Sequence, residues 1–366
     1  MPSNRAAWIP ARHRPLEVGP APYTAPGPGQ IVVRNHAVAL NPLDWVIQLA
    51  GRVAYTWLTY PAVLGADLAG EVVEVGADVT RFQPGDRVLA LSVGTDKDAD
   101  SAAQGAFQHY AVVEERLASP LPPGLSYVDA AVLPLGLSTA ACALFQKDHL
   151  ALPHPTATPQ PSGQTVLVWG GSTSVGTNAI QLAVAAGYEV ITTASPHNAD
   201  RLMDLGATRV FDYRSPTVEA DIVEAFAGRT FAGALAVGPG STPACIRIAG
   251  KCHGNRLVSM VTAPVTFENG FSLLRTATGM VGGMVSWQGA AWRRGVRLKF
   301  VIGSDLKKNE VATAIFRDFL PDALAQGRYQ PLPPASTVGS SLEDLQHAMD
   351  LQRKGVSATK LVVTLD

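Results

Sequence analysis

The chain has 366 residues, of which 47% are hydrophobic and 16% charged, and its formal net charge at pH 7 is -1. This length favours two domains over a single core. Without an excess of basic residues, neither nucleic acid nor an anionic membrane is an expected partner. The three cysteines are too few for a disulfide framework, and no apolar segment resembles a signal peptide or a membrane span. We therefore expect a cytoplasmic, water-soluble protein.

The first 139 residues predict a β-rich domain. Short apolar runs at 29–34, 70–76 and 86–90 are each bounded by glycine, proline or aspartate, which is the pattern of strands separated by turns.

From residue 140 onward, apolar runs alternate with helical stretches. The expected strands are 165–169, 189–193, 209–211, 233–237, 256–260 and 298–302. This alternation predicts an α/β domain with a doubly wound parallel sheet. Helices at 310–325 and 342–351 and a strand at 360–365 follow.

We assign 1–139 with 305–366 to the first domain and 140–304 to the second. The proline-rich segment 152–161 is expected to be a surface insertion, with a partner-binding polyproline segment as the alternative.

A strand, a small-residue turn and a helix follow one another at 166–186. This arrangement directs backbone N–H groups and a helix N-terminus at a pyrophosphate, and its place inside a βαβ unit predicts a dinucleotide site. We expect the hydroxyls of Thr173 and Ser174 to donate to phosphate where glycines are more common. The expected binding residues are Gly170, Gly171, Ser172, Thr173, Ser174, Val175 and Gly176.

The end of the next strand indicates which nicotinamide cofactor binds. An NAD site places an acid there to accept from the ribose 2′-hydroxyl, but this strand continues without one. A 2′-phosphate would instead accept from the side chains that follow, so we expect NADPH. These side chains are Ser195, His197, Asn198 and Arg201.

Several ordered motifs resemble the medium-chain dehydrogenase/reductase superfamily. They are Gly65-Ala-Asp-Leu-Ala-Gly70, Pro84-Gly-Asp-Arg-Val88, Gly105-Ala-Phe-Gln-His-Tyr-Ala111, Leu133-Pro-Leu-Gly-Leu-Ser-Thr139 and the glycine turn. The resemblance covers nearly the whole chain and is greatest to zinc-free quinone oxidoreductases and fungal trans-acting enoyl reductases. It implies a GroES-like catalytic domain beside a Rossmann domain.

The resemblance also implies roles for individual residues. It places Tyr213 at the 2′-phosphate, Thr139 beside the nicotinamide and Asn41 near the reacting face. A lysine that is usual in quinone oxidoreductases is replaced here by Asn198, so Arg201 or Arg214 is expected to substitute for it.

The zinc ligands of related alcohol dehydrogenases are missing. The matching segments read Asn41-Pro-Leu-Asp44 and Gly65-Ala66-Asp67, without the cysteine and histidine ligands, and no cysteine lies within 90–115. We therefore expect no metal. Asp44 and Asp67 are expected to hold backbone groups rather than to transfer protons.

Reduction of a conjugated C=C bond needs no Lewis acid, so we expect an NADPH-dependent reductase of an α,β-unsaturated carbonyl compound. The substrate is either a free enone, alkenal or quinone, or a polyketide chain on an acyl carrier protein. A carrier would need a basic patch, for which Arg293, Arg294, Arg297 and Lys299 are candidates. The alternative of another class is a non-catalytic NADPH-binding or redox-sensing protein.

Two apolar segments bear on assembly. Residues 276–285 are apolar and glycine-rich, and 298–302 is the last strand expected in the second domain. The resemblance to quinone oxidoreductases implies a homodimer through this region, whereas trans-acting enoyl reductases can be monomers.

Overall fold

The computed structural model describes residues 2–264 and 272–365, and the chain divides into two compact units. Unit 1 comprises Met1–Leu135 and Ala312–Asp366, and unit 2 comprises Gly136–Val311. The boundaries expected from the sequence lie at 139/140 and 304/305.

Unit 1 is built on a seven-stranded, mainly antiparallel sheet with the order β15-β16-β3-β5-β6-β8, in which β7 also pairs with β3. A smaller sheet has the order β2-β1-β4. The long strand β3 is almost entirely buried because apolar side chains occupy both of its faces. The strands are β1 (Asn4–Ile9), β2 (Glu17–Ala21), β3 (Gln30–Ala39), β4 (Ala62–Val63), β5 (Asp67–Val75), β6 (Arg87–Leu91), β7 (Tyr110–Glu114), β8 (Ala118–Pro120), β15 (Ala335–Gly339) and β16 (Lys360–Thr364).

The helices of unit 1 are short. The helix expected at 310–325 is a continuous helical run, but Thr313–Phe319 is a π-helix. Pro321 supplies no N–H for the usual bond to the preceding turn, which accounts for the wider turns before it. The α-helices are α1 (Pro42–Ala50), α2 (Ser101–Gln104), α3 (Tyr127–Ala130), α10 (Leu320–Ala325) and α11 (Leu345–Lys354).

Unit 2 contains the predicted parallel sheet, with the order β11-β10-β9-β12-β13-β14 in the described part of the chain. The order reverses between β9 and β12, and ligands of such sheets bind outside the carboxyl ends of the strands at this point. The strands are β9 (Gln164–Trp169), β10 (Glu189–Ala194), β11 (Arg209–Asp212), β12 (Thr230–Ala236), β13 (Leu257–Met260) and β14 (Arg297–Phe300).

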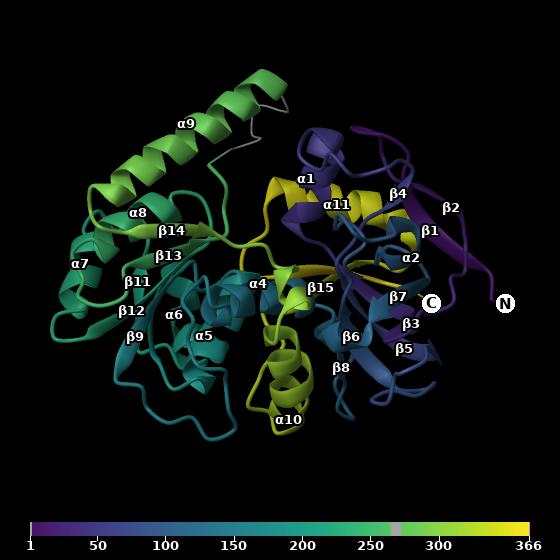
Figure 1. Cartoon of the computed structure of the whole chain (residues 1–366), viewed down its shortest axis with the longest axis horizontal. Coiled ribbons are helices and arrows are strands. Elements are labelled where there is room, and N and C mark those ends of the chain that lie inside the picture. The colour runs from purple at the N-terminus through teal and green to yellow at the C-terminus, as the bar shows by residue number, and fades with distance from the viewer. Residues whose placement is uncertain (1, 265–271, 366) are drawn as a thin grey trace. The chain divides into compact units, whose positions relative to one another are not determined.

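Helices cover both faces of this sheet (Figure 1). Right-handed crossovers place α5 and α6 on one face, and they place α7, α8 and α9 on the other because the strand order runs in the opposite direction there. One hydrophobic core cluster of unit 2 lies on the second face, where α7, α8 and the sheet bury Ile222, Phe231 and Ile248. The helices are α5 (Ser174–Ala185), α6 (Ala199–Asp204), α7 (Val218–Ala225), α8 (Ser241–Ala249) and α9 (Leu273–Trp292).

Helix α4 (Pro134–Phe145) begins six residues before residue 140, the position from which helical stretches were expected. Proline is favoured at the first position of a helix, so Pro134 is the start signal that the sequence interpretation missed. The stretch Tyr127–Phe145 is long and apolar enough to cross a membrane, but 83% of its most apolar window is buried. Core helices share these properties, so we assign no membrane span to it.

The proline-rich segment is fixed to unit 2 at two points. The Thr156 N–H donates to Ala185 O at 2.9 Å and the Ser162 N–H donates to Gly187 O at 2.8 Å. These bonds satisfy the carbonyl group of Ala185, at the end of α5, and that of Gly187, just beyond it.

Candidate functional site

The turn between β9 and α5 has the geometry of a phosphate-binding loop. Gly170 has φ +89°, and Thr173 is the N-cap of α5. Among the described residues, the N–H groups of Ser174 and Val175 in the first turn have no backbone acceptor. Free N–H groups at a helix N-terminus form an anion-binding site.

Two close approaches explain the glycines of this turn. A Cβ on Gly176 would lie 2.2 Å from Gly170 O, and a Cβ on Gly171 would lie 2.2 Å from Thr192 Oγ1. The turn is therefore too tight for side chains, which leaves the backbone open to a ligand.

The hydroxyls of the turn differ from expectation at Thr173. Its Oγ1 donates to Gly170 O at 2.7 Å and accepts from the Gly176 N–H at 3.0 Å, so it caps the helix and is not a spare phosphate donor. The Ser174 Oγ, by contrast, is buried without a hydrogen-bond partner. A buried hydroxyl beside free N–H groups fits the pyrophosphate of a dinucleotide.

The residues expected at the 2′-phosphate lie at the carboxyl ends of β10 and β11. The register pairs Ala194 with Asp212, so the next residues, Ser195 and Tyr213, follow adjacent strand ends. The Arg214 guanidinium lies 4.9 Å from the centre of the Tyr213 ring. This edge therefore presents a hydroxyl, a phenol and a cation from neighbouring strands.

The other three residues of this group lie just beyond β10. His197 Nε2 and Asn198 Nδ2 are 3.2 Å apart, and Asn198 is buried whereas His197 is exposed. Arg201 is exposed on α6. The acid nearest this edge, Asp212, accepts the backbone N–H of Arg214 at 3.0 Å.

In unit 1, four buried polar groups meet where β3 ends. Asn41 Nδ2 donates to Asp67 Oδ2 at 2.9 Å, and Lys360 Nζ lies 2.8 Å from the same carboxylate oxygen. Lys360 Nζ also donates to Asn41 Oδ1 at 2.6 Å. The fourth group, Asp44, accepts the Asn41 backbone N–H at 2.7 Å.

Sequence reasoning placed Asn41, Asp44 and Asp67 in this region but missed Lys360. A lysine at the start of a strand whose next three residues, 361–363, are buried and apolar was the available signal. Its partner could not be read from the sequence, because pairing depends on the register of strands far apart in the chain.

Glycine is required in the segment that carries Asp67. Gly65 has φ +92°, and a Cβ there would lie 2.4 Å from the Phe107 ring. The buried ring packs against the bare backbone and fixes the approach to β5. The Asp67 Oδ1 accepts the backbone N–H of Leu135 at 2.6 Å, so this carboxylate holds a backbone group, as expected, and an ion pair as well.

Burial raises the pKa of Asp44 to about 7. The nearby Asp67 carboxylate adds to the rise, while the backbone N–H of Asn41 and the Lys360 ammonium oppose it. A carboxyl group with this pKa is partly protonated and partly ionised near neutral pH.

The structure also places Thr139, which was expected beside the nicotinamide, and the phenol and thiol groups that could carry other chemistry. Thr139 lies in the second turn of α4. Burial raises the pKa of Tyr55 to about 12, and its ring contacts Trp57 edge-on. All three cysteines are free and buried. No group of three or more His, Cys, Asp and Glu side chains able to hold a metal occurs among the described residues.

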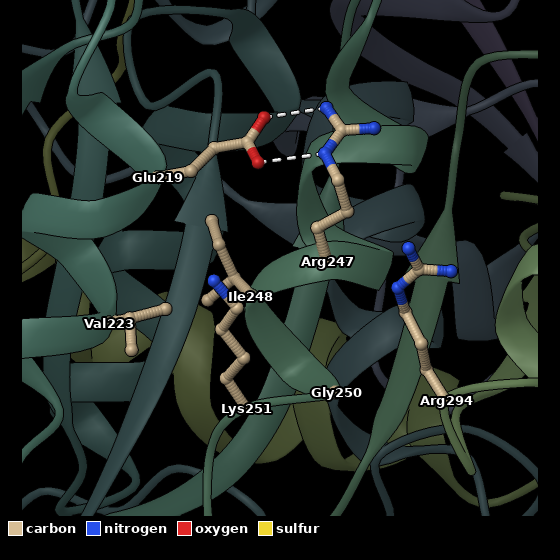
Figure 2. A pocket seen from close by; sticks show the side chains of 7 residues that line it. All are labelled: Glu219, Val223, Arg247, Ile248, Gly250, Lys251 and Arg294. Carbon is tan, nitrogen blue, oxygen red and sulfur yellow. Dashed lines mark hydrogen bonds and ion pairs between the residues drawn. The ribbon is translucent and has the colours of Figure 1, made fainter.

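A pocket of about 220 Å³ lies on the outer surface of unit 2, away from the glycine turn. Figure 2 shows Arg247 and Glu219 pointing at each other across it, with bonds of 2.7 and 2.6 Å. Lys251 and Arg294 line its other side. Arg247 lies in the last turn of α8 and Lys251 just beyond the helix, where cations are favoured.

The basic residues expected to receive a carrier protein lie on and just before β14. Arg293 and Arg294 precede β14, and Arg297 begins it. The three arginines therefore lie at the amino ends of the parallel strands, whereas the glycine turn lies at the carboxyl ends. Lys299 is paired with Asp148 at 2.6 Å. Within unit 2, the three arginines and the glycine turn therefore lie at opposite ends of the strands.

Comparison with known proteins agrees with this architecture. Residues 27–123 match the alcohol dehydrogenase GroES-like domain. Dehydrogenase pigH from Monascus ruber is 50% identical over 369 residues, with 100% of both chains covered. Trans-enoyl reductase himH from Aspergillus japonicus is 36% identical, with 99% of this chain and 97% of that protein covered.

A solved structure of an alcohol dehydrogenase superfamily protein from Novosphingobium aromaticivorans matches with a TM-score of 0.75 and 26% identity, covering 99% of this chain and 100% of that one. Full-length similarity at these identities confirms the resemblance found in the sequence. The chain belongs to the medium-chain dehydrogenase/reductase superfamily of nicotinamide-dependent oxidoreductases.

Proposed function

We propose that the protein is a cytoplasmic, zinc-independent, NADPH-dependent reductase of the C=C bond of an α,β-unsaturated carbonyl compound. The observation that best supports this is the Lys360 ammonium against Asn41 and Asp67. Asn41 stands where zinc relatives have a cysteine ligand, and Ala66 stands where they have a histidine. A fixed cation at this place would repel a divalent metal ion, and neither side chain is a good zinc ligand.

Without a metal ion, the protein would promote hydride transfer by orienting the cofactor and substrate and by hydrogen bonding to the substrate. When bound, the nicotinamide supplies a hydride. The free N–H groups of Ser174 and Val175 would hold its pyrophosphate, and the Thr139 hydroxyl would orient its nicotinamide end. Negative charge grows on the substrate's carbonyl oxygen, where the Asn41 amide donates a hydrogen bond that strengthens in the transition state.

The preference for NADPH rests on the carboxyl edge of β10 and β11. Ser195 and Tyr213 offer hydroxyl donors, and Arg201 and Arg214 offer cations. Asp212, the nearby acid, is engaged by backbone. These groups suit a 2′-phosphate dianion better than a 2′-hydroxyl.

A second candidate is reduction of a carrier-bound polyketide chain by a trans-acting enzyme. The similarity to trans-enoyl reductase himH favours it. The arginines before β14 do not, because they lie at the sheet edge opposite the cofactor site. The alternative without turnover, an NADPH-binding or redox-sensing protein, is separated from both by measuring NADPH consumption.

The deciding experiment uses NADPH deuterated at C4 with a panel of enones, quinones and enoyl thioesters. Deuterium on the β-carbon of the product, with the carbonyl intact and solvent D₂O labelling the α-carbon, supports the proposal. Thr139→Val should lower kcat more than NADPH affinity. Deuterium at the former carbonyl carbon would reveal a carbonyl reductase, and tight NADPH binding without turnover would favour the non-catalytic alternative.

A further inference from the structure

We propose that Lys360 is a positioning residue that fixes the Asn41 amide so that only an N–H of this side chain faces the substrate. The inference deepens the proposed function and rests on it, because it concerns the carbonyl-binding role of Asn41.

Sheet register places Lys360 beside Asn41. Strand β16 runs antiparallel to β3, with Val363 opposite Val38 and Val362 opposite Ala39. The Leu40 N–H donates to Leu361 O at 3.0 Å, which extends the pairing by one step. The next residues, Asn41 and Lys360, therefore come together beyond the end of β3.

The same register brings in Asp67 from the other side. Strand β5 pairs with β3 so that Asp67 lies opposite Ala39. Lys360 and Asp67 therefore flank β3 on neighbouring strands, and their charges meet at 2.8 Å next to Asn41. The side chains are almost completely buried, with 6% of Lys360 and none of Asp67 exposed.

The two charges determine which way the amide of Asn41 points. An ammonium can only donate and a carboxylate can only accept. Lys360 therefore selects Oδ1, at 2.6 Å, and Asp67 selects Nδ2, at 2.9 Å. The reversed amide would place two donors together and two acceptors together, so the orientation has one favourable solution.

The donors that remain define what this cluster offers a ligand. The Asn41 amide nitrogen has two N–H groups, one of which Asp67 accepts. The Lys360 ammonium has three, of which Asn41 and Asp67 accept two. Among the described residues each nitrogen thus keeps one N–H without an acceptor. The ligand atom they suit is a carbonyl oxygen that gains negative charge.

The test replaces the charged pair with neutral side chains of similar size, in Lys360→Met/Asp67→Asn, so that neither partner of the pair is left as a buried charge without the other. Lys360→Arg is the second variant, since it keeps the ion pair but replaces the compact ammonium by a planar fork. Lys354→Met, an exposed lysine on α11, is the matched control. Two readouts are used: hydrogen exchange of the Asn41 side-chain amide by NMR in asparagine-labelled protein, and steady-state kinetics with NADPH and an enone.

In the double variant we expect the Asn41 amide to exchange faster and kcat to fall, each by about tenfold or more, the scale of a lost charged hydrogen bond. The KM for NADPH should stay within about twofold, as for an interaction that acts on the chemical step. Lys360→Arg should lower kcat as well, and Lys354→Met should change nothing.

Unchanged amide exchange in both Lys360 variants, or unchanged kcat despite faster exchange, would overturn the inference. Failure of the proposed function looks different: the wild-type protein would reduce no conjugated carbonyl compound. The exchange measurement would still decide whether Lys360 and Asp67 hold the Asn41 amide.

Discussion

Asp67 accepts the backbone N–H of Leu135 at 2.6 Å, so a carboxylate from β5 caps the first turn of α4. The same carboxylate neutralises Lys360. A single buried side chain thus satisfies a helix N-terminus and a buried cation, and its loss affects both.

Replacing this carboxylate with an amide, Asp67→Asn, should destabilise the fold by about 3 kcal/mol or more, because it leaves the Lys360 ammonium buried without a counter-charge. Urea denaturation measures the change. Asp98→Asn, at an exposed aspartate of the same unit, is the control and should stay within about 0.5 kcal/mol of wild type. Equal midpoints for both variants would contradict the assigned ion pair.

The residues at the carboxyl ends of β10 and β11 predict that NADPH binds more tightly than NADH. Tyr213→Phe and Ser195→Ala should each weaken NADPH by about 1 kcal/mol or somewhat more, the scale of a hydrogen bond to a charged group. NADH affinity should hardly change, because NADH has no 2′-phosphate. Fluorescence titration of both nucleotides measures this, with Tyr23→Phe in unit 1 as the control. Equal affinities for the two nucleotides in the wild type would refute the preference.

Asp44 predicts a loss of stability as the pH rises. Its pKa in the folded protein is about 7, above the ordinary value of 3.8, so the folded state keeps a proton that the unfolded state has released. Folding stability therefore falls between about pH 4 and pH 7, by an amount on the order of a few kcal/mol.

Asp44→Asn removes this titration but keeps an oxygen that can accept the Asn41 N–H. Its free energy of unfolding should change less than that of the wild type between pH 5 and pH 8. Urea melts across this range provide the measurement, and parallel pH profiles for the two proteins would show that burial does not raise the pKa of Asp44.

Replacing a helix glycine with alanine should stabilise the protein at some positions and destabilise it at others. Gly282 and Gly289 lie within α9, where an added Cβ would meet nothing within 4 Å, whereas a Cβ on Gly136 would lie 2.3 Å from Ser174 Oγ. Gly282→Ala and Gly289→Ala should each stabilise the protein by about 0.5–1 kcal/mol. Gly136→Ala should destabilise it by about 1–3 kcal/mol through overpacking. Thermal denaturation of the three variants tests the signs.

These glycines also show where sequence reasoning reached its limit. The strand, turn and helix around Gly170 could be predicted because local periodicity and a helix N-terminus agree there. Helix α9 was not assigned, because its four glycines lower helix propensity and its support comes from packing against α8 and the sheet. The local sequence pattern was enough to identify elements with strong propensity. Where propensity was weak, as in α9, tertiary packing determines whether a helix forms.

The site shows the same limit. Asn41 and Asp67 were found through motifs, but their link to Lys360 spans 319 and 293 positions and depends on strand register. The hydroxyl of Thr173 was assigned to phosphate because the two bonds it makes instead, accepting from the Gly176 N–H and donating to Gly170 O, depend on a turn geometry that residue type does not specify.

The exposed apolar surface of unit 2 indicates how the protein assembles. Strand β14 ends the sheet of unit 2 in the described part of the chain, and two large apolar side chains at or just beyond it, Phe300 and Ile302, are 42% and 52% exposed. On α9, Val281 and Val285 are one turn apart and 65% and 67% exposed. An open edge strand next to exposed apolar residues favours pairing with a second copy, and two β14 strands can pair about a twofold axis.

We therefore expect a homodimer at micromolar concentration, measured by light scattering. Ile302→Glu should convert it to a monomer, because pairing would bury an unpaired charge. Val356→Glu, at a 39% exposed valine of unit 1, should leave the dimer intact. A wild-type protein that is already monomeric would contradict the prediction. It would shift weight toward the trans-acting, carrier-dependent reductase, since the apolar surface of unit 2 would then be open to a different protein.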